Sequence, residues 1–394
     1  MTPAARVQAA IEILDEVISG AVAGGAPADR IVSAYFKTRR YAGSKDRRAV
    51  RELVYSAIRV CGEVPKTGRA AMMRLVEEDA SLSVLFDGST HGPAVIEADE
   101  RPARAGVAPD WLIARLQSSG LDDAEMAALM DRAPLDIRLN AKHAQRHTFE
   151  FPVEVEWLTL PNARRLPSGT PVEQWDAYKD GLIEVQDLGS QLISLISGAY
   201  ATFLTIDLCA GAGGKTLAMA CERTHSGRIV ASDTDRRRLS RLMPRAKRAG
   251  VADSVETRLL DPGKELEALS DLKGQADFVL VDAPCSGTGT WRRKPEAKWR
   301  LTPDRLDRFA KTQDYLLDLA AELTRPNGVI GFVTCSLLDE EGKDRVEAFL
   351  KRHPEWKAEP YLQFPIGRQH GQGLRLTPYH DGTDGFFVAM LGSS

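Results

Sequence analysis

Two cysteines stand directly after apolar runs that have the composition of buried strands. Cys285 follows the run 278–281 within the sequence DAPCS, and Cys335 follows the run 329–333 within the sequence TCS. Because the carboxyl ends of neighbouring parallel strands meet at one edge of a sheet, we expect the two thiols to lie close together. A cysteine thiolate is a strong nucleophile near neutral pH. The pattern therefore predicts covalent catalysis by a thiol, with the carboxyl group of Asp282 beside it.

Carbon 5 of a pyrimidine is a target whose methylation needs such a thiol. This carbon is a poor nucleophile until a thiolate adds to carbon 6 and converts the ring to an enamine. After methyl transfer, a base removes the proton from carbon 5 and the thiol leaves. An acid near N3 stabilises the charge that develops on the ring, and Asp282 is placed for that role.

Two other interpretations of these positions were open from the residues alone. Enzymes that methylate exocyclic amines place an acid or Asn, two prolines and an aromatic residue at the fourth strand end. This chain has Ala283 in place of the first proline and Cys285 in place of the aromatic, and both count against amine methylation. The second alternative is that the thiols are small buried core residues. We assign Cys61 and Cys221, which fall in helical patterns, to that inert class, and Cys209 to loop packing.

A glycine-rich segment, DLCAGAGGKT at 207–216, follows another apolar run and precedes a helical pattern. Glycines at such a place let the backbone approach a ligand at the N-terminus of a helix. A P-loop would need glycine where Cys209 stands, and a dinucleotide fingerprint would need glycine where Thr216 stands. The loop therefore favours a ligand without a phosphate chain.

Four successive strand ends carry an aspartate, namely Asp207, Asp233, Asp261 and Asp282. A carboxylate at the second strand end can accept hydrogen bonds from both hydroxyls of a ribose. The carboxylate at the third could hold an adenine amino group. S-adenosylmethionine, with its cationic sulfonium, suits such an acidic rim. A single aspartate is more often a helix N-cap, but four in sequence make that interpretation weak.

The elements that would position these groups alternate between strand and helix from about residue 186. Continuous apolar strands separated by helical patterns predict a parallel sheet that is covered on both faces, and therefore an α/β fold. The expected strands are 203–208, 229–232, 255–259, 278–281, 329–333 and 385–391.

The preceding chain divides into two further regions. Residues 1–105 predict a helical domain, with apolar stripes over 6–22 and 46–60 and a Gly, Pro and charge-rich linker at its end. Residues 106–185 predict a small α+β module. Residues 186–394 form the third expected domain.

Composition and charge limit the classes of protein to which this chain can belong. The chain has 394 residues, a formal net charge of −3 and 43% hydrophobic residues, which is ordinary for a globular protein. No apolar run reaches the ~18 residues of a membrane span, and the start lacks the apolar block of a secretory signal. Five scattered cysteines without a CxxC pair predict no disulfide framework and no metal site. We therefore expect a cytoplasmic protein with no membrane contact.

Three motifs in order, DLCAGAGGKT, DAPCSGTGTWRRKPEAKW and TCS, resemble the Fmu/Sun family of RNA cytosine-C5 methyltransferases. The likeness extends over about residues 106–394. It implies a Rossmann-like class I methyltransferase domain with a mostly parallel seven-stranded sheet. It also implies that Cys335 attacks carbon 6, and that Cys285 helps to release the product.

The same resemblance assigns the remaining site residues. Asp282 and Lys215 belong with the catalytic groups, because Lys215 is expected close to the cofactor or target base. The expected S-adenosylmethionine site consists of Cys209, Ala210, Gly211, Ala212, Gly213, Gly214, Lys215, Asp233, Asp261 and Asp282. Family members often have Gly-Pro where this chain has Gly211-Ala212, which changes the stiffness of the loop.

The helical start resembles the NusB-like RNA-binding domain of bacterial members, best at GSKDRR followed by LVYSAIR. The segment after it is compressed and partly acidic. The resemblance implies ribosomal RNA as substrate, with transfer RNA as the alternative. A non-catalytic RNA-binding assembly factor is a rival from another class. A small-molecule methyltransferase is a further rival, disfavoured by Cys285 and the basic loop after it.

Basic residues provide candidate contacts to an RNA backbone, although the net charge argues against non-specific coating. No obligatory protein partner is evident. The candidates for phosphate contact are Arg292, Arg293, Lys294 and Lys298 after the first cysteine, and Arg138 and Asn140 in the middle module.

Overall fold

The computed structural model describes residues 1–223, 227–360 and 365–393, and these divide into two compact units. The first unit combines Met1–Arg132 with Thr290–Pro303, and the second combines Ala133–Gly289 with the chain from Asp304 onward. This division differs from the predicted boundaries at 105 and 185. The helices after residue 106 join the first unit, whereas the strands before residue 185 join the second. The assignment of separate roles to residues 1–105, 106–185 and 186–394 stays a prediction.

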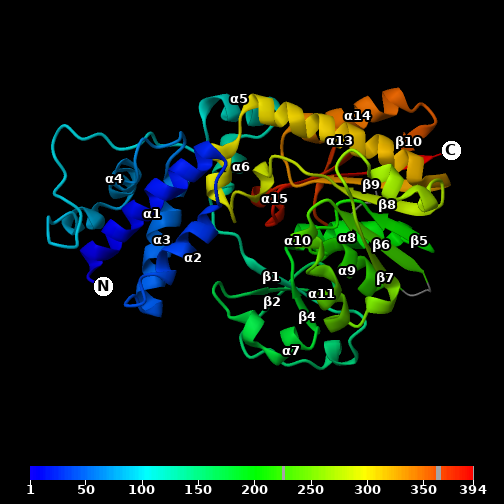
Figure 1. The fold of residues 1–394 in the computed structure, drawn as a ribbon, viewed down its shortest axis with the longest axis horizontal. Coiled ribbons are helices and arrows are strands. Elements are labelled where there is room, and N and C mark those ends of the chain that lie inside the picture. Colours follow the sequence, from blue (N-terminus) through cyan, green and yellow to red (C-terminus); the bar gives the residue numbers. More distant parts are fainter. Residues whose placement is uncertain (224–226, 361–364, 394) are drawn as a thin grey trace. The chain divides into compact units, whose positions relative to one another are not determined.

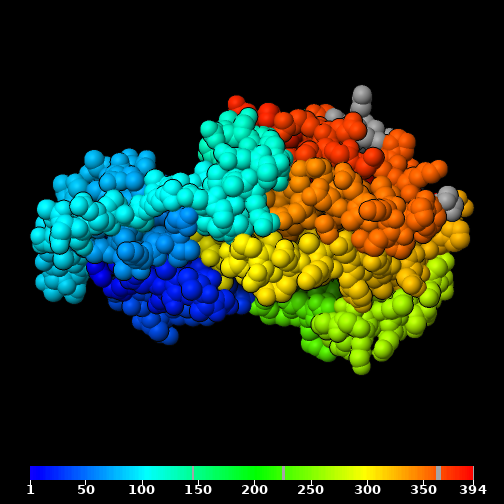
Figure 2. All heavy atoms as spheres, turned by 90° about the horizontal axis from the view of Figure 1, so that it is seen from above, coloured from blue at the N-terminus to red at the C-terminus, as the bar shows by residue number. Residues whose placement is uncertain are grey.

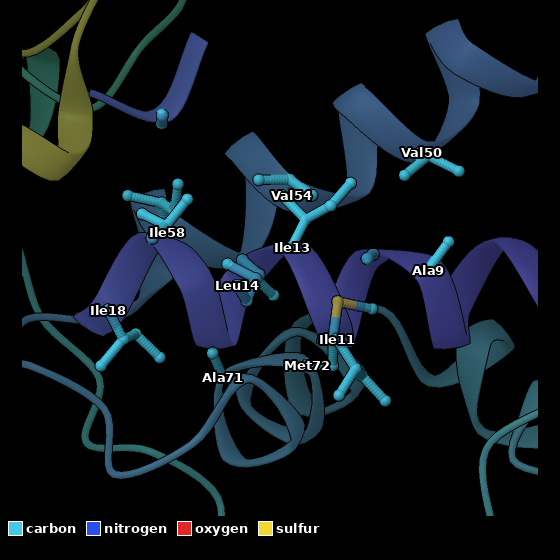
Figure 3. Close-up of a cluster of buried hydrophobic side chains, with 14 of the residues drawn as sticks. Ala9, Ile11, Ile13, Leu14, Ile18, Val50, Val54, Ile58, Ala71 and Met72 are labelled. Carbon is cyan, nitrogen blue, oxygen red and sulfur yellow. The ribbon is translucent and has the colours of Figure 1, made fainter. Parts of the chain in front are cut away.

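The first unit is helical, as its apolar stripes predict. The apolar face of α1 packs between α3 and α4, and Figure 3 shows Leu14 and Ile13 in this cluster with Val54 of α3 and Met72 of α4. The N-terminus of α4 approaches α1 so closely that a side chain at Gly68 would collide with the backbone oxygen of Ile11. The helices are α1 (Pro3–Ala23), α2 (Ala28–Lys37), α3 (Ser44–Val60), α4 (Gly68–Glu78), η1 (Ala80–Leu85), α5 (Asp110–Ser118), α6 (Asp123–Ala128) and η7 (Pro295–Arg300).

The segment 290–303 belongs to this helical unit although it directly follows the Cys285 loop in sequence. The indole of Trp299 donates to the backbone oxygen of Gly62 at 3.2 Å. Lys298 is 0% exposed and its ammonium lies 3.4 Å from the sulfur of Met130. Burial lowers the pKa of Lys298 to about 7.

Two of the four phosphate contacts expected in this segment are therefore wrong. Lys298 is fully enclosed, and the side chain of Arg292 is also buried. These two side chains turn inward because the apolar residues around them pack into the helical unit. Arg293 and Lys294 are exposed and stay candidates.

The second unit is built on a large mixed sheet with the strand order β11-β12-β13-β9-β8-β5-β6-β7, and β10 pairs with β13. The five strands β7, β6, β5, β8 and β9 are parallel, and β13 runs antiparallel to β9. The α/β prediction is confirmed, but the sheet has nine strands among the described residues, not seven. The strands are β5 (Leu204–Asp207), β6 (Arg228–Asp233), β7 (Val255–Leu259), β8 (Ala276–Asp282), β9 (Thr324–Thr334), β10 (Trp356–Ala358), β11 (Arg368–His370), β12 (Gly373–Leu376) and β13 (Phe386–Ser393).

Two apolar layers hold helices against the two faces of this sheet. One layer joins α8, α9 and α11 to the sheet, and the other joins α12, α13 and α14 to it. Helices α13 and α14 lie side by side (Figures 1 and 2), joined by an ion pair of 2.6 Å between Arg345 and Asp314. The helices are α8 (Leu188–Tyr200), α9 (Gly214–Glu222), α10 (Arg236–Leu239), α11 (Leu242–Arg248), η4 (Ala252–Ser254), α12 (Glu265–Ala268), η5 (Ser270–Leu272), η6 (Thr288–Thr290), α13 (Pro303–Leu323), η8 (Asp339–Glu341), α14 (Lys343–Arg352) and α15 (Pro378–Asp381).

A separate antiparallel sheet with the order β2-β3-β1-β4 precedes the large one. Two candidate RNA contacts on it are wrong. Arg138 is 4% exposed and donates to Gln186 at 2.8 Å, and the amide of Asn140 donates to two backbone oxygens. These polar groups are used inside the fold. The elements are β1 (Leu135–Leu139), η2 (Ala144–His147), β2 (Glu156–Trp157), β3 (Ala163–Leu166), η3 (Val172–Gln174), α7 (Asp176–Lys179) and β4 (Ile183–Val185).

None of the helices in the described parts of the chain has the length and apolar character that crossing a membrane would require.

Candidate active site

The predicted chemical groups meet at the carboxyl edge of the parallel strands. In the sheet register, Asp207 at the end of β5 pairs with Leu280 of β8, and Asp282 at the end of β8 pairs with Val333 of β9. The two cysteine loops therefore start from adjacent strands. Asp233 ends β6 on the other side of β5. The side chain of Asp261 is exposed just beyond the end of β7.

The thiols of Cys285 and Cys335 lie side by side, with their sulfur atoms 3.4 Å apart. Both cysteines are free and partly exposed. The hydrogen bond to Cys335, together with burial, raises the pKa of the Cys285 thiol well above its ordinary value. Of the other three cysteines, Cys61 and Cys221 are buried, and burial raises the pKa of the Cys209 thiol well above its ordinary value. The two thiols thus have the arrangement expected for a donor thiol beside a nucleophile.

Lys215 and Asp282 form an ion pair next to these thiols. The ammonium nitrogen of Lys215 lies 2.7 Å from Oδ2 of Asp282, and the two side chains are 10% and 32% exposed. Burial opposes the charged form of Lys215, but the Asp282 carboxylate outweighs it and raises the lysine pKa. The ammonium also lies 5.6 Å from the ring centroid of Phe386, which supports the cation further. The sequence placed Lys215 near the site but did not indicate this pair.

The glycine loop takes a backbone conformation that requires glycine at two positions. Gly211 and Gly213 have φ values of 56° and 86°, a region that other residues rarely adopt. The carboxylate of Asp233 accepts hydrogen bonds from the backbone nitrogen of Gly211 at 2.8 Å and of Asp235 at 2.7 Å. Asp233 therefore ties the loop to the end of β6.

These residues fit S-adenosylmethionine. A side chain at Gly214 would meet no other atom within 4 Å. The space at the N-terminus of α9 is therefore open, and a ligand can reach the loop backbone. Carboxylates stand at the ends of β6 and β8 and beyond β7, and a carboxylate can accept hydrogen bonds from hydroxyl and amino groups and stabilise a nearby cation. Among the described residues, His, Cys, Asp and Glu side chains do not gather into a group that could hold a metal ion.

Asp207, under the glycine loop, is buried and titrates abnormally. Its Oδ2 accepts a 2.6 Å hydrogen bond from Thr216, and its Oδ1 is enclosed. The Asp207 pKa is about 7 instead of 3.8, because burial and the charge of Asp282 raise it by more than the Thr216 hydrogen bond lowers it.

We expect Asp207 to make stability depend on pH. The folded protein keeps a proton that the unfolded chain releases, so the free energy of unfolding falls as pH rises from about 4 to about 7. Asp207→Asn keeps an acceptor for Thr216 but does not titrate. In denaturant unfolding at a series of pH values, the stability of the native chain relative to this variant should fall by a few kcal/mol across that window. A difference independent of pH would contradict the assignment.

A buried polar network between the two cysteine loops was not predicted. Glu341 accepts a 2.8 Å hydrogen bond from the backbone nitrogen of Ser286 and another from the hydroxyl of that residue. The hydroxyls of Ser286 and Ser336 are 3.2 Å apart. The shared serine after each cysteine, in PCS and TCS, was the only signal in the sequence. It could not reveal Glu341.

The fold and the arrangement of the site are those of the S-adenosylmethionine-dependent methyltransferase class. The computed fold resembles the crystal structure of PH0851 with a TM-score of 0.75 and 25% identity over 99% of each chain. It also resembles NSun6 from Pyrococcus horikoshii, solved with SFG, with a TM-score of 0.51 and 29% identity over 60% of this chain and 58% of that one.

The particular family follows from sequence. A model described as "16S rRNA methyltransferase RsmB/F" matches residues 201–392. "Ribosomal RNA small subunit methyltransferase B" of Xylella fastidiosa (strain 9a5c) is 33% identical over 293 residues, which are 72% of this chain and 68% of the relative. The corresponding protein of Pasteurella multocida is 31% identical over 291 residues, 72% of this chain and 64% of the relative. The chain belongs to the RsmB/F family.

The matched part spans about two thirds of these curated relatives, from 64% to 68% of their length. Family membership agrees with the resemblance seen in the three motifs.

Proposed function

We propose that this chain methylates carbon 5 of cytosine in RNA, with ribosomal RNA as the substrate. The observation that carries the proposal is the pair of sulfur atoms 3.4 Å apart at the edge of the sheet, beside the Lys215–Asp282 ion pair. An amine methyltransferase has no use for two adjoining thiols. The family supports ribosomal RNA over transfer RNA.

The residues act in a definite order in this proposal. The Cys335 thiolate adds to carbon 6 of the cytosine, and the electron pair displaced toward N3 is stabilised by the Lys215–Asp282 pair, whose ammonium carries a proton. Bound S-adenosylmethionine supplies the electrophilic methyl group. Loss of the carbon 5 proton to a base then restores the double bond and expels the Cys335 sulfur. The Cys285 thiol donates a hydrogen bond to that departing sulfur.

S-adenosylmethionine would be held by the glycine loop 209–215 and by three carboxylates. We assign the ribose hydroxyls to Asp233, the adenine amino group to Asp261 and the neighbourhood of the sulfonium to Asp282. Cys209 and Ala210 to Gly214 contribute backbone and close packing at the start of α9.

Replacement of Asp233 should weaken cofactor binding. Asp233→Ala removes a charged acceptor and also releases the Gly211 nitrogen that the carboxylate holds, so we expect a loss of ~1–3 kcal/mol in the free energy of binding. Isothermal calorimetry with S-adenosylmethionine measures this loss. Asp253→Ala, an exposed aspartate on η4, is the matched control. Unchanged affinity in Asp233→Ala would reject the ribose role.

A target base must leave its stack to reach the thiols, so RNA must be held beside the site. Arg293 and Lys294 are exposed candidates for phosphate contacts, and binding should weaken with salt. The all-helical residues 1–105 are proposed to bind RNA as well. We place the protein in the cytoplasm, where the reducing environment keeps thiols free.

Bisulfite sequencing of total RNA tests the function directly. In cells that contain this protein, at least one cytosine in ribosomal RNA should resist conversion by bisulfite. In cells that lack the protein, the same cytosine should be converted. Loss of protection only in transfer RNA would favour the alternative substrate. No loss in either RNA would reject the proposal.

A further inference from the structure

We infer that Glu341 is a positioning residue that holds the sulfur of Cys285 against the sulfur of Cys335. The role of the two thiols in RNA methylation rests on the proposed function. The positioning role of Glu341 does not, because it follows from the hydrogen bonds of a buried carboxylate.

The carboxylate of Glu341 binds the peptide group that joins Cys285 to Ser286. Glu341 lies on η8 and is 0% exposed. One carboxylate oxygen accepts from the backbone nitrogen of Ser286 at 2.8 Å and from the side-chain amide of Gln313 at 3.2 Å, and the other accepts from the Ser286 hydroxyl. The amide of Gln313 also donates to the backbone oxygen of Pro284 at 2.9 Å. The peptide units on both sides of Cys285 are thus tied to Glu341 and its amide partner.

Glu341 also contacts the residue that precedes Cys335. The backbone oxygen of Glu341 accepts from the hydroxyl of Thr334 at 3.1 Å, immediately before Cys335. Immediately after it, the hydroxyl of Ser336 lies 3.2 Å from that of Ser286. The backbone oxygen of Cys335 itself accepts from the nitrogen of Gly289 at 3.0 Å. The distance between the two sulfur atoms is therefore set by a network centred on Glu341.

A carboxylate is a costly way to fill a core, since burial disfavours its charge. Burial raises the pKa of Glu341, and hydrogen bonds from Ser286, Ser336 and Gln313 oppose that rise. The Glu341 carboxylate supplies two acceptor oxygens, and both accept hydrogen bonds from Ser286 in the Cys285 loop. Its charge also acts on the thiol: after the Cys335 hydrogen bond and burial, it is one of the groups that raise the pKa of Cys285. A thiol that keeps its proton is suited to donate it, and the Glu341 charge favours that role for Cys285.

The first test measures position without RNA. The purified protein is treated with a fixed concentration of diamide, and the rate of intramolecular disulfide formation between Cys285 and Cys335 is followed by mass spectrometry. Glu341→Ala and Glu341→Gln lose the same charge, but glutamine keeps an oxygen for the Ser286 nitrogen. We expect the alanine variant to be at least about 10-fold slower than the glutamine variant, because reactions between groups held in contact are sensitive to small displacements. Equal rates would overturn the inference.

A second variant guards against a folding defect. If Glu341→Ala loses cooperative unfolding, Ser286→Ala decides instead, since it keeps the charge of Glu341 and removes one contact. Slower disulfide formation than in the native chain supports the inference, and an unchanged rate overturns it. Glu347→Ala, an exposed glutamate on α14, is the matched control and should behave as the native chain.

Methylation kinetics provide the functional readout. In the folded alanine variant, kcat should fall about 100-fold while KM for RNA stays within about 3-fold, and glutamine should restore most of kcat. A rise in KM alone would overturn the positioning role. If the native protein methylates no RNA but Glu341→Ala still slows disulfide formation, the proposed function fails and the inference stands.

Discussion

Cys335→Ala should abolish RNA methylation while cofactor affinity stays close to that of the native chain. In the proposed mechanism the sulfur of Cys335 bonds to carbon 6, and without that bond carbon 5 remains too poor a nucleophile to take a methyl group. Loss of a covalent nucleophile costs more than about 10⁴-fold in kcat. The measurement is transfer of labelled methyl groups from S-adenosylmethionine to unmodified ribosomal RNA.

The controls separate loss of chemistry from loss of fold. Calorimetry should show S-adenosylmethionine binding in Cys335→Ala, because the glycine loop and Asp233 are held by their own hydrogen bonds. Cys221→Ala removes a buried thiol of α9 and should keep measurable methylation. Full activity in Cys335→Ala would refute the assignment of the nucleophile.

Cys285→Ala should accumulate a covalent protein–RNA adduct. The Cys335 sulfur can still attack, but the departing sulfur has lost the neighbouring thiol, 3.4 Å away, that we propose as its proton donor. We therefore expect release to become the slow step and turnover to fall by about 100-fold or more. Incubation with RNA and S-adenosylmethionine, followed by a denaturing gel, should show a band of protein bound to RNA that heating in detergent leaves intact.

The double variant makes this experiment specific. Cys285→Ala combined with Cys335→Ala should give no adduct, because the attacking sulfur is absent. A band that persists in the double variant would mean that another group bonds to the RNA. Absence of a band in Cys285→Ala with Cys335 intact would show that Cys285 has no part in release.

The grouping of the site residues could be predicted because it depends on short sequence patterns. Apolar runs of four to eight residues mark buried strands, and residues directly after parallel strands must share one edge of the sheet. These patterns place Asp207, Asp233, Asp282, Cys285 and Cys335 at one edge, and the register of β5, β6, β8 and β9 agrees. The helices of the first unit followed in the same way from apolar periodicity.

Contacts between residues far apart in the chain could not be predicted. Ser286 and Glu341 are 55 residues apart, and nothing local distinguishes Glu341 from Asp339 and Glu340, its partly exposed acidic neighbours. Lys298 and Arg138 have the sequence character of surface cations, yet both are buried. A charged side chain turns inward when the backbone that carries it is anchored by other residues, as Trp299 anchors the segment around Lys298.

The sequence by itself therefore determined the residue types, the order of strands and helices, and the edge at which the chemistry takes place. Only the tertiary structure decided which of these groups touch, namely the Lys215–Asp282 ion pair, the adjoining thiols and the carboxylate behind them. The physical reason is that strand and helix formation depends on nearby residues in the chain. The distance between two side chains depends on how all the intervening elements pack.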